Sequence, residues 1–235
     1  MNLQVFDRYA DMSRAAASFM HRCVMNKPDL LLCPASGNSP RKTYDDLVAR
    51  MNETRLRHAM RVIGLDEWMG ISQDNPSGSG YQLRSQLIEP LGIRDYFLFD
   101  GKYAEEETEL RRASDYLEKN GPIDLCVLGI GTNGHLGLNE PGEFLNASIH
   151  SARLAESTRG HHMVAGASFR PEYGITLGMK DILSSRKILL LVSGDHKRAV
   201  LADFMTRKVR TQLPASFLWL HPDLTCMFDR EALPA

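Results

Sequence analysis

The sequence has almost no excess of charge of either sign and few cysteines. Its 235 residues carry 28 basic and 29 acidic side chains, which gives a formal net charge of -1. No overall field therefore favours nucleic acid or an anionic membrane as a partner. The cysteines are scattered and mostly lie inside apolar runs, at Cys23, Cys33, Cys126 and Cys226. They indicate buried thiols in a reducing compartment and exclude a disulfide framework or a C-x-x-C metal site.

Long apolar runs and several catalytic signatures are missing as well. No positively charged, apolar leader opens the chain, and no apolar stretch approaches the length that crosses a bilayer. We therefore expect a cytoplasmic protein without a membrane partner. Neither a G-x-S-x-G nucleophile elbow nor a ligand spacing typical of a metal site is found. Without linkers, repeats or charge blocks, residues 1–235 are expected to form a single domain, and a hydrophobic content of 43% allows one large core.

Strand-like and helix-like segments alternate along the chain. The most continuous apolar run, Lys187–Ser193, is typical of a central parallel strand that is covered on both faces. Further strands are expected at Leu30–Cys33, Met60–Leu65, Ile123–Leu128, Phe217–Leu220 and Leu224–Phe228. Helices are expected at Asp11–Lys27, Arg41–Met51, Tyr81–Leu91, Tyr103–Lys119 and His196–Met205. This alternation predicts an α/β fold, a doubly wound, mostly parallel, Rossmann-like sheet with helices on both faces.

A glycine-rich loop ends the apolar run within Leu125–Pro141, which is L-C-V-L-G-I-G-T-N-G-H-L-G-L-N-E-P. Gly129, Gly131 and Gly134 spell the G-x-G-x-x-G pattern of dinucleotide-binding proteins. That pattern requires a long helix whose N-terminus holds the pyrophosphate. Pro141 has no amide proton and clashes with a preceding turn, so no ordinary helix runs through it. The sequence therefore argues against a nicotinamide cofactor.

The same loop carries a histidine and a glutamate. A lone histidine is more often a structural residue, but the glycines around His135 and the hydrogen-bond partners available in Asn133 and Glu140 favour catalysis. Histidine titrates near neutrality and needs a neighbour that fixes its tautomer. A proton-transfer pair at the carboxyl end of a buried strand is a usual way for an α/β enzyme to build its active site. The segment therefore predicts an enzyme.

Two adjacent carboxylates, Asp66 and Glu67, follow the apolar strand expected at Met60–Leu65. They cannot both face one direction if the strand continues. At a strand end they can, or one serves as a base while the other anchors the loop. The pair also fits a simpler role as a cap of the next turn.

A polar segment after the strand at Leu30–Cys33 has the composition of an anion site. The residues that supply hydroxyls, an amide and unhindered backbone N–H groups are Ser36, Gly37, Asn38 and Ser39. Pro40 is expected at the first helical position, where no donor is needed. The free N–H groups and the positive dipole end of the following helix suit a phosphate, although the same residues fit an ordinary helix cap. At another strand end, Lys197 can neutralise the same phosphate or simply be solvated.

Taken in their order, these segments resemble the glucosamine-6-phosphate deaminase/isomerase family, and the resemblance covers nearly the whole chain. The matching blocks are A-S-G-N-S-P at Ala35–Pro40, L-D-E-W at Leu65–Trp68, G-I-G-T-N-G-H-L-G-L-N-E-P at Gly129–Pro141, I-T-L-G-M-K-D-I-L at Ile175–Leu183, V-S-G-D-H-K at Val192–Lys197 and P-A-S-F-L-W-L-H at Pro214–His221. Within the family, the chain is most similar to the galactosamine-6-phosphate isomerase branch. The resemblance implies conversion of a small-molecule substrate, an amino-sugar 6-phosphate, to a ketohexose 6-phosphate and ammonia, without a metal or organic cofactor.

The resemblance also implies roles for individual residues. Asp66 is the general base that moves a proton between C2 and C1 of the open-chain sugar, a shift for which one carboxylate suffices. His135 assists ring opening, and Glu140 and Asn133 orient it. The residues expected to hold the phosphate are Ser36, Gly37, Asn38, Ser39 and Lys197.

The chain departs from the family pattern at two places. Asn133 stands where glucosamine-type deaminases usually have an aspartate. The arginine that such deaminases add to the phosphate site has no clear counterpart, and Arg159 and His161 are weak candidates for its place. The substrate class is unaffected, but the preference between galactosamine 6-phosphate and glucosamine 6-phosphate stays open. A homo-oligomer is compatible with the sequence.

Two alternative functions stay open. The related 6-phosphogluconolactonases share the fold and the G-x-G-x-x-G-H core, but they usually follow the histidine with a threonine and an S-L-F-P-type segment. This chain has L-G-L-N-E-P there. The other alternative is a non-catalytic sugar-phosphate-binding protein, because the same fold serves as the effector domain of certain transcriptional regulators. Those regulators carry an N-terminal helix-turn-helix, whereas this chain is expected to begin with a strand.

Overall fold

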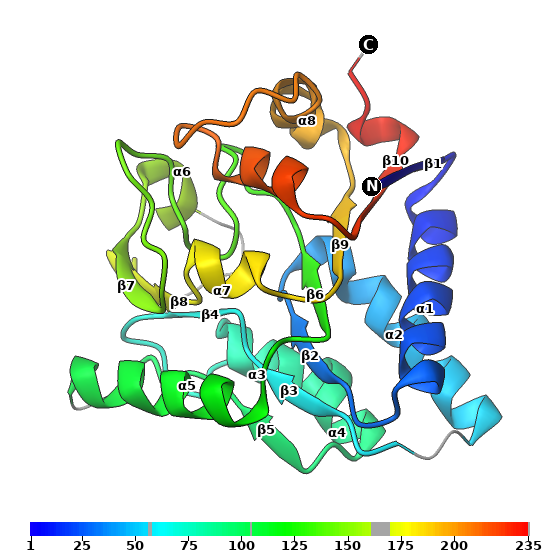
Figure 1. Cartoon of the computed structure of the whole chain (residues 1–235), viewed down its shortest axis with the longest axis horizontal. Helices are drawn as coiled ribbons and strands as arrows, with labels where there is room; N and C mark the ends of the chain where they lie inside the picture. Colours follow the sequence, from blue (N-terminus) through cyan, green and yellow to red (C-terminus); the bar gives the residue numbers. More distant parts are fainter. Residues whose placement is uncertain (56–57, 104, 161–169, 235) are drawn as a thin grey trace.

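A computed structural model describes residues 1–55, 58–103, 105–160 and 170–234. Within these residues, seven parallel strands form the main sheet in the order β1-β10-β9-β6-β2-β3-β5 (Figure 1). Their bounds are β1 Asn2–Phe6, β2 Leu31–Pro34, β3 Arg61–Ile63, β5 Asp95–Phe97, β6 Leu125–Leu128, β9 Ile188–Val192 and β10 Leu224–Asp229. A second, antiparallel sheet has the order β4-β8-β7, with bounds β4 Asp66–Trp68, β7 His150–Arg153 and β8 Tyr173–Thr176.

Helices cover both faces of the main sheet (Figure 1), which confirms the doubly wound α/β prediction. The α-helices are α1 Tyr9–Asn26, α2 Asn38–Thr54, α3 Ser79–Leu83, α4 Glu89–Leu91, α5 Glu106–Asn120, α6 Glu156–Arg159, α7 Met179–Leu183 and α8 Arg198–Phe204. A π-helical turn, η1 Arg84–Ile88, joins α3 to α4, and 3-10 turns lie at η2 Asp195–Lys197, η3 Pro214–Leu220 and η4 Arg230–Ala232. The expected helices are all present, with ends that differ by a few residues.

The apolar strands are explained by the two cores that they separate. In β9 all five residues are buried. Ile188 and Leu190 pack into the core that includes residues of α5, α7 and α8, whereas Leu189 and Leu191 pack into the core beneath α1 and α2. Successive side chains of a strand point to opposite faces, so a strand covered on both sides is a continuous apolar run.

The direction of winding reverses between the neighbouring strands β2 and β6. From β2 the sheet continues through β3 to β5, and from β6 it continues through β9 to β10 and β1. The loops after two such strands diverge and leave a crevice at the carboxyl ends, where doubly wound folds bind their ligands. The segments Ser36–Ser39 and Gly129–Pro141 follow β2 and β6, so the topology places both at this crevice.

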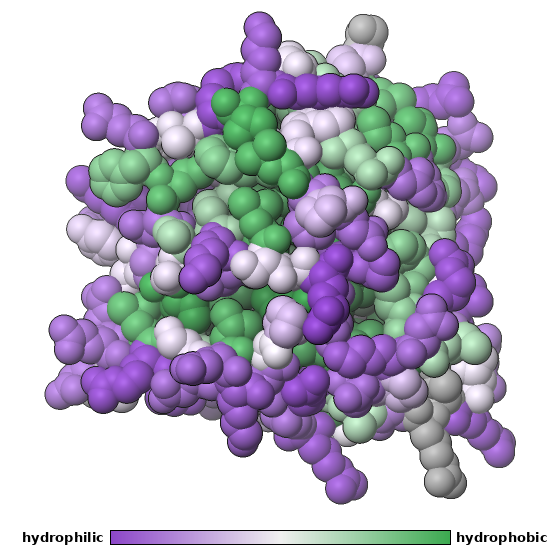
Figure 2. All heavy atoms as spheres, in the orientation of Figure 1, coloured by the Kyte–Doolittle hydropathy of each residue, from purple (hydrophilic) through white to green (hydrophobic). Residues whose placement is uncertain are grey.

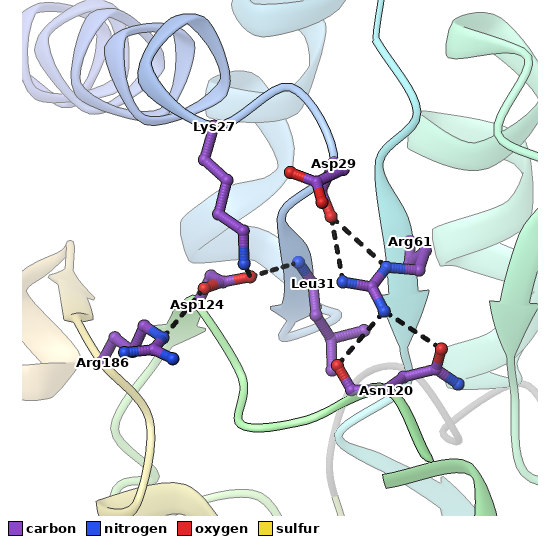
Figure 3. Close-up of polar contacts among 7 residues, drawn as sticks. All are labelled: Lys27, Asp29, Leu31, Arg61, Asn120, Asp124 and Arg186. Atoms are coloured by element: carbon purple, nitrogen blue, oxygen red, sulfur yellow. Dashed lines mark hydrogen bonds and ion pairs between the residues drawn. The ribbon is translucent and has the colours of Figure 1, made fainter.

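The opposite edge, at the amino ends of the strands, is closed by polar contacts (Figure 3). Asp124 Oδ2 accepts hydrogen bonds from Lys27 Nζ (2.6 Å) and the backbone N–H of Leu31 (2.8 Å), and its Oδ1 lies 3.2 Å from Arg186 Nε. Arg61 donates to backbone and side-chain oxygens of the residues beside it, Asp29 and Asn120. These contacts connect the starts of β2, β3, β6 and β9.

Two parts of the fold differ from the sequence-based expectations. Phe217–Leu220, expected as a strand, belongs to the 3-10 helix η3, because Pro214 presets a helical φ at its start. A short apolar run fits either a strand or a buried helical turn, so its pattern does not separate the two. The antiparallel sheet β4-β8-β7 and the edge strand β5 were not expected, since each strand has only three or four residues.

Hydrophilic side chains surround the face shown in Figure 2, and apolar ones reach the surface over η3 and α8. Exposed apolar residues in the described part of the chain include Val209 and Leu220. No described helix combines the length and apolar character that crossing a membrane requires. The cytoplasmic location stays a prediction.

Candidate active site

Loops at the carboxyl ends of β2, β6 and β9, together with β4, surround one pocket. Its lining consists of Ala35, Ser36, Gly37, Asn38, Ser39, Pro40, Leu65, Asp66, Trp68, Gly129, Ile130, Gly131, His135, Gly137, Leu138 and Lys197. All of the predicted site residues except Asn133 and Glu140 are in this set. Segments that lie more than 150 residues apart in the sequence, from Ser36 to Lys197, therefore share one cavity.

The loop after β2 brings the N-terminus of α2 to the pocket. Gly37 adopts φ 97° and ψ -171°, a conformation that residues with side chains rarely adopt. Its own N–H donates to Gln82 Oε1 (3.3 Å), so Gly37 shapes the turn and its N–H is already engaged. The helix begins at Asn38, so the predicted first position of Pro40 is wrong and Pro40 is the third helical residue. No donor is needed there either, because the first four N–H groups of a helix have no intrahelical acceptor.

Lys197, at the end of η2, lies beside this helix terminus. Burial lowers the pKa of Lys197 to about 8, and no carboxylate among the described residues lies close enough to offset that burial. An ammonium in this state gains from a bound anion, because the anion restores the charged form. Lys197, Asn38 and Ser39 also line an adjoining cavity of about 390 Å³, so the pocket continues past the N-terminus of α2.

A buried carboxylate supports the turn that carries Lys197. Asp229, at the end of β10, accepts hydrogen bonds from the backbone N–H groups of Gly194 (3.1 Å) and Ala232 (2.9 Å), and from the Ser193 hydroxyl. Gly194 has φ 90°, which favours glycine. The position of Lys197 is therefore set by a residue that follows it by more than thirty positions.

Asp66 reaches the pocket because the chain leaves the main sheet after β3. Gly64 and Leu65 separate β3 from β4, which pairs with β8 in antiparallel register, Asp66 opposite Thr176. Asp66 thus begins a new strand and does not end the expected one. Burial raises the pKa of Asp66 to about 6, against the lowering effects of a hydrogen bond from Ser79 and of the nearby His135. A carboxylate that titrates close to neutrality is suited to take up and return a proton.

Glu67 points away from Asp66 and anchors the loop, as one of the sequence-based alternatives proposed. Its Oε1 accepts the backbone N–H groups of Trp68 (2.8 Å) and Ser79 (2.9 Å), and its Oε2 accepts that of Gly80 (2.8 Å). The side chain is only 1% exposed. Burial raises the pKa of Glu67 to about 7, whereas these three backbone hydrogen bonds oppose the rise. Asp66 therefore lines the pocket, and Glu67 supports the backbone behind it.

The loop after β6 holds the imidazole of His135 against its own backbone. A Cβ atom at Gly131 would lie 2.4 Å from Cε1 of His135, so a side chain there would displace the ring. Gly134 has φ 90°, and a Cβ on it would lie 2.3 Å from Leu213 Cδ1. No helix follows these glycines before α6 in the described chain, which confirms that the G-x-G-x-x-G pattern is not a dinucleotide fingerprint.

Three polar residues lie beside Nδ1 or the backbone of His135. Its Nδ1 lies 3.2 Å from Thr158 Oγ1 and 3.5 Å from Glu140 Oε2. Asn133 donates from Nδ2 to Glu140 Oε2 (2.8 Å), and its Oδ1 accepts the backbone N–H of His135 (3.2 Å). Asn133 therefore orients Glu140 and the loop, whereas Thr158 and Glu140 contact the ring. Burial raises the pKa of Glu140, but hydrogen bonds with His135, Thr158 and Asn133 outweigh it and lower this pKa below the ordinary value.

Residues that the sequence did not single out complete the site. Ser79 donates to Asp66 Oδ1 (3.0 Å), Thr158 contacts the ring of His135, and Asp229 holds the turn before Lys197. None belongs to the blocks that carry the resemblance, and a serine or threonine in a polar loop has no distinctive local pattern. Their spacing from their partners, 13, 23 and 35 residues, is visible only in the folded chain.

Arg159 and His161 were the candidates for the arginine of the phosphate site. Arg159 directs its guanidinium to Glu156 (3.3 Å) and Glu172 (3.7 Å) and is not among the residues that line the pocket. His161 lies outside the described residues. The described residues contain no group of three or more histidine, cysteine, aspartate or glutamate side chains placed to hold a metal ion. A reaction without a metal stays a prediction.

Carboxylates and a histidine at the carboxyl ends of a doubly wound sheet are typical of α/β enzymes that use acid–base chemistry. The model of the family described as glucosamine-6-phosphate isomerases/6-phosphogluconolactonase matches residues 7–226 of this chain. The chain belongs to that family.

Individual relatives are similar over nearly their whole length. The provisionally assigned deaminase AgaI of Escherichia coli (strain K12) is 38% identical over 229 residues, which are 97% of this chain and 91% of that protein. The glucosamine-6-phosphate deaminase of Geobacillus sp. (strain WCH70) is 38% identical over 96% of this chain and 92% of its own.

The chain is also similar to solved structures. One described as a monomeric glucosamine-6-phosphate deaminase of the NagB superfamily superposes with a TM-score of 0.93 at 32% identity, covering 99% of this chain and 98% of that chain. The 6-phosphogluconolactonase of Trypanosoma brucei has a TM-score of 0.73 at 19% identity, covering 98% and 97%. The second likeness shows the shared fold alone.

Proposed function

We propose that this protein is an amino-sugar 6-phosphate deaminase, which converts a hexosamine 6-phosphate and water to a ketohexose 6-phosphate and ammonia. In this proposal residues 1–235 act as one domain. The observation that carries it is the pocket itself, where a carboxylate with a pKa of about 6, a buttressed histidine, a helix N-terminus and a lysine with no ion pair among the described residues meet. The similarity to proteins named glucosamine-6-phosphate deaminases supports the substrate class.

The anion site holds the phosphate. In the pocket that Ser36 also lines, the first-turn N–H groups of Asn38 and Ser39 lie at the positive end of the α2 dipole, and the Ser39 hydroxyl and the Lys197 ammonium supply further donors. A phosphate held there positions the rest of the sugar along the pocket. Binding energy from a group that does not react is thereby used to orient the carbons that do.

His135 opens the pyranose ring. Its Nδ1 faces Thr158 and Glu140, so Nε2 is the ring nitrogen left for the substrate. Ring opening breaks the C1–O5 bond, gives a proton to O5 and removes one from the hydroxyl on C1. A histidine can do both in turn, because it exchanges protons near neutral pH. Glu140 balances the charge when the imidazole is protonated.

Asp66 carries out the isomerisation of the open-chain aldehyde. Its carboxylate removes the proton from C2 while the C1 oxygen takes up a proton, which gives an enolamine. Asp66 returns its proton to C1, and the nitrogen on C2 becomes an iminium. Water adds to C2, the C2–N bond breaks, and ammonia leaves as the ketose forms. One carboxylate that reaches both carbons satisfies the two proton transfers.

The two shifted pKa values predict a bell-shaped pH profile of kcat/KM. Asp66 acts when ionised, so activity falls as the pH drops through about 6. Lys197 binds the phosphate when charged, so activity falls as the pH rises through about 8. The free substrate's phosphate and amine also titrate in this range. For that reason the two limbs are assigned by whether substitution of Asp66's neighbours or of Lys197 moves them.

The direct test measures ammonia released from glucosamine 6-phosphate and from galactosamine 6-phosphate, with hydrolysis of 6-phosphogluconolactone measured in parallel. We expect ammonia from at least one amino sugar and a much lower rate with the unphosphorylated sugar. The ratio of the two epimers decides the preference at C4. Turnover of the lactone alone would contradict the proposal and establish the lactonase alternative, and binding without turnover would establish the non-catalytic one.

A further inference from the structure

A chain of hydroxyl groups connects the anion site to the base. The Ser36 hydroxyl donates to Ser79 Oγ (3.0 Å), and the Ser79 hydroxyl donates to Asp66 Oδ1 (3.0 Å). Ser36 lines the pocket in the loop after β2, whereas Asp66 begins β4. Ser79, the first residue of α3, thus bridges two segments that carry different parts of the proposed chemistry.

Ser79 is held rigidly. Its side chain and backbone are 1% exposed, and its N–H donates to Glu67 Oε1 (2.9 Å). The next residue, Gly80, donates its N–H to the other oxygen of Glu67 (2.8 Å). The buried carboxylate beside Asp66 therefore fixes the backbone that presents the Ser79 hydroxyl. A buried hydroxyl whose backbone is anchored on both sides has little freedom to turn away from its partner.

The hydrogen bond from Ser79 makes the two oxygens of Asp66 inequivalent. Oδ1 accepts from Ser79, whereas Oδ2 lies on the side of Gly137. A Cβ atom at Gly137 would lie 3.4 Å from Oδ2, in van der Waals contact with it, and Gly137 also has φ 56°. Oδ2 accepts no hydrogen bond from the described residues, and Asp66 and Gly137 both line the pocket. One oxygen is held by Ser79, and the other has no hydrogen bond to a described residue.

We propose that Ser79 is a positioning residue that directs Oδ2 of Asp66 to the substrate and couples the base to the phosphate loop through Ser36. This inference rests on the proposed function only in its kinetic consequences, because the hydroxyl chain exists without substrate. A phosphate that engages the Ser36 loop is thereby connected to the orientation of the carboxylate that moves the proton.

The electrostatic effect of Ser79 gives the proposal a measurable signature. A donor to the ionised carboxylate favours that form, so the hydrogen bond from Ser79 lowers the pKa of Asp66 against burial, which raises it to about 6. Ser79→Ala removes the donor but keeps the backbone N–H that Glu67 binds. The acidic limb of kcat/KM should move up by about one pH unit. At pH 7.5, kcat should fall about tenfold, because the base is both less ionised and less well oriented.

Two variants accompany Ser79→Ala. Ser79→Cys keeps a weak donor and should give an intermediate shift of the limb. Ser13→Ala is the matched control, because Ser13 is a buried serine of α1 whose hydroxyl has no hydrogen-bond partner among the described residues. It should leave the limb and kcat unchanged. An acidic limb that stays in place in folded Ser79→Ala and Ser79→Cys would overturn the assignment.

A titration without substrate separates this inference from the proposed function. The side-chain carboxyl of Asp66 can be followed by 13C NMR and assigned with Asp66→Asn. We expect its titration midpoint to rise in Ser79→Ala relative to the parent, whatever the enzyme turns over. A shifted midpoint in a protein that releases no ammonia would refute the proposed function and keep the contact. An unshifted midpoint in an active deaminase would refute the role of Ser79.

The link to Ser36 is tested by a double-mutant cycle. If Ser36 acts on Asp66 through Ser79, the effects of Ser36→Ala and Ser79→Ala on the acidic limb should be less than additive in the double variant. Ser36→Ala alone should shift the limb in the same direction by a smaller amount, because it removes only the donor to Ser79. Additive effects would overturn the coupling between the phosphate loop and the base.

Discussion

Acidic and basic residues lie at both ends of the strands of the main sheet. They are paired at the amino ends and incompletely paired at the carboxyl ends. At the amino ends Asp124 is surrounded by Lys27, Arg186 and the backbone N–H of Leu31 (Figure 3). In the described part of the chain, Asp66 at the carboxyl ends has a hydrogen-bond donor on one oxygen and none on the other, and Lys197 has no ion pair. The charges at the amino ends are already paired, so a bound ligand would gain little there.

The difference shows how one fold divides its stability and its chemistry. Paired charges at the start of the strands hold β2, β6 and β9 together, whereas incompletely paired charges at their ends have pKa values moved toward neutrality, to about 6 and about 8. Groups that are buried without full pairing reduce stability but are ready for proton transfer or for an anion. Matched substitutions at the two edges can therefore test the division.

The largest expected effect is at the base. Asp66→Asn keeps the shape and should lower kcat by about 100- to 10,000-fold, the usual contribution of a positioned base, with KM largely kept. The folded-state pKa of Asp66 lies above its unfolded value, so its ionisation disfavours folding above pH 6. The variant should therefore be at least as stable as the parent at pH 8 in urea unfolding. Near-normal turnover would remove Asp66 from the role.

Lys197→Ala should raise KM for the phosphorylated sugar about 10- to 100-fold, because it removes a charged contact that binds ground and transition states alike. The basic limb of kcat/KM near pH 8 should disappear with it. Lys187→Ala is the control at the other end of the same strand, where Lys187 pairs with Asp223. Equal KM values in the two variants would contradict an anion site at Lys197.

Asp124→Asn should lower stability and leave activity unchanged, which is the reverse of the effect expected for Asp66→Asn. It removes the charge that Lys27 and Arg186 share while keeping an acceptor for Leu31, so the free energy of unfolding should fall by about 1–2 kcal/mol. The loss is limited because the Lys27 and Arg186 side chains are 44% and 62% exposed. Activity at temperatures below the transition should be unchanged. A folded Asp124→Asn variant with impaired kcat would break the division between the edges.

Thr158→Val should lower kcat by about two- to tenfold with KM kept, because it removes one uncharged hydrogen bond from the ring of His135. Thr158→Ser retains the hydroxyl and should behave like the parent. Steady-state kinetics of the pair distinguish loss of the hydroxyl from altered packing. If both variants lose activity equally, packing and not the hydrogen bond is the contribution of Thr158.

The smallest effect is expected from Asn133→Asp. A carboxylate would replace the amide that donates to Glu140 Oε2, so the pKa of Glu140 should rise from its lowered value by about one unit. 13C NMR of the side-chain carboxyls, assigned with Glu140→Gln, measures that shift. The acidic limb of kcat/KM should stay near 6, because Asp66 determines it. An acidic limb that moves in Asn133→Asp but not in Ser79→Ala would contradict its assignment to Asp66.

Local patterns were enough to predict the main parallel sheet and the helices that cover it. Buried strands such as β9 are apolar at every position because helices cover both sheet faces, and α1 buries Met12, Ala16 and Met20 at helical spacing. The turn after β6 could be recognised as something other than a dinucleotide site, because Pro141 excludes a helix by its covalent structure. The segment Phe217–Leu220 could not, since a short apolar run is compatible with both a strand and a helical turn.

The sequence by itself determined the alternation of strands and helices, the two-sided core and the polar loops in which Asp66, His135, Ser36 and Lys197 lie. Only the tertiary structure decided that these loops share a pocket, that Glu67 supports the backbone, and that Ser79, Thr158 and Asp229 contact Asp66, His135 and the turn before Lys197. The physical reason is the distance along the chain between the residues that interact. Element type follows from a repeat of two or 3.6 residues, which neighbours along the chain reveal. A hydrogen bond between segments depends on strand order and on where the winding reverses, which no local repeat contains.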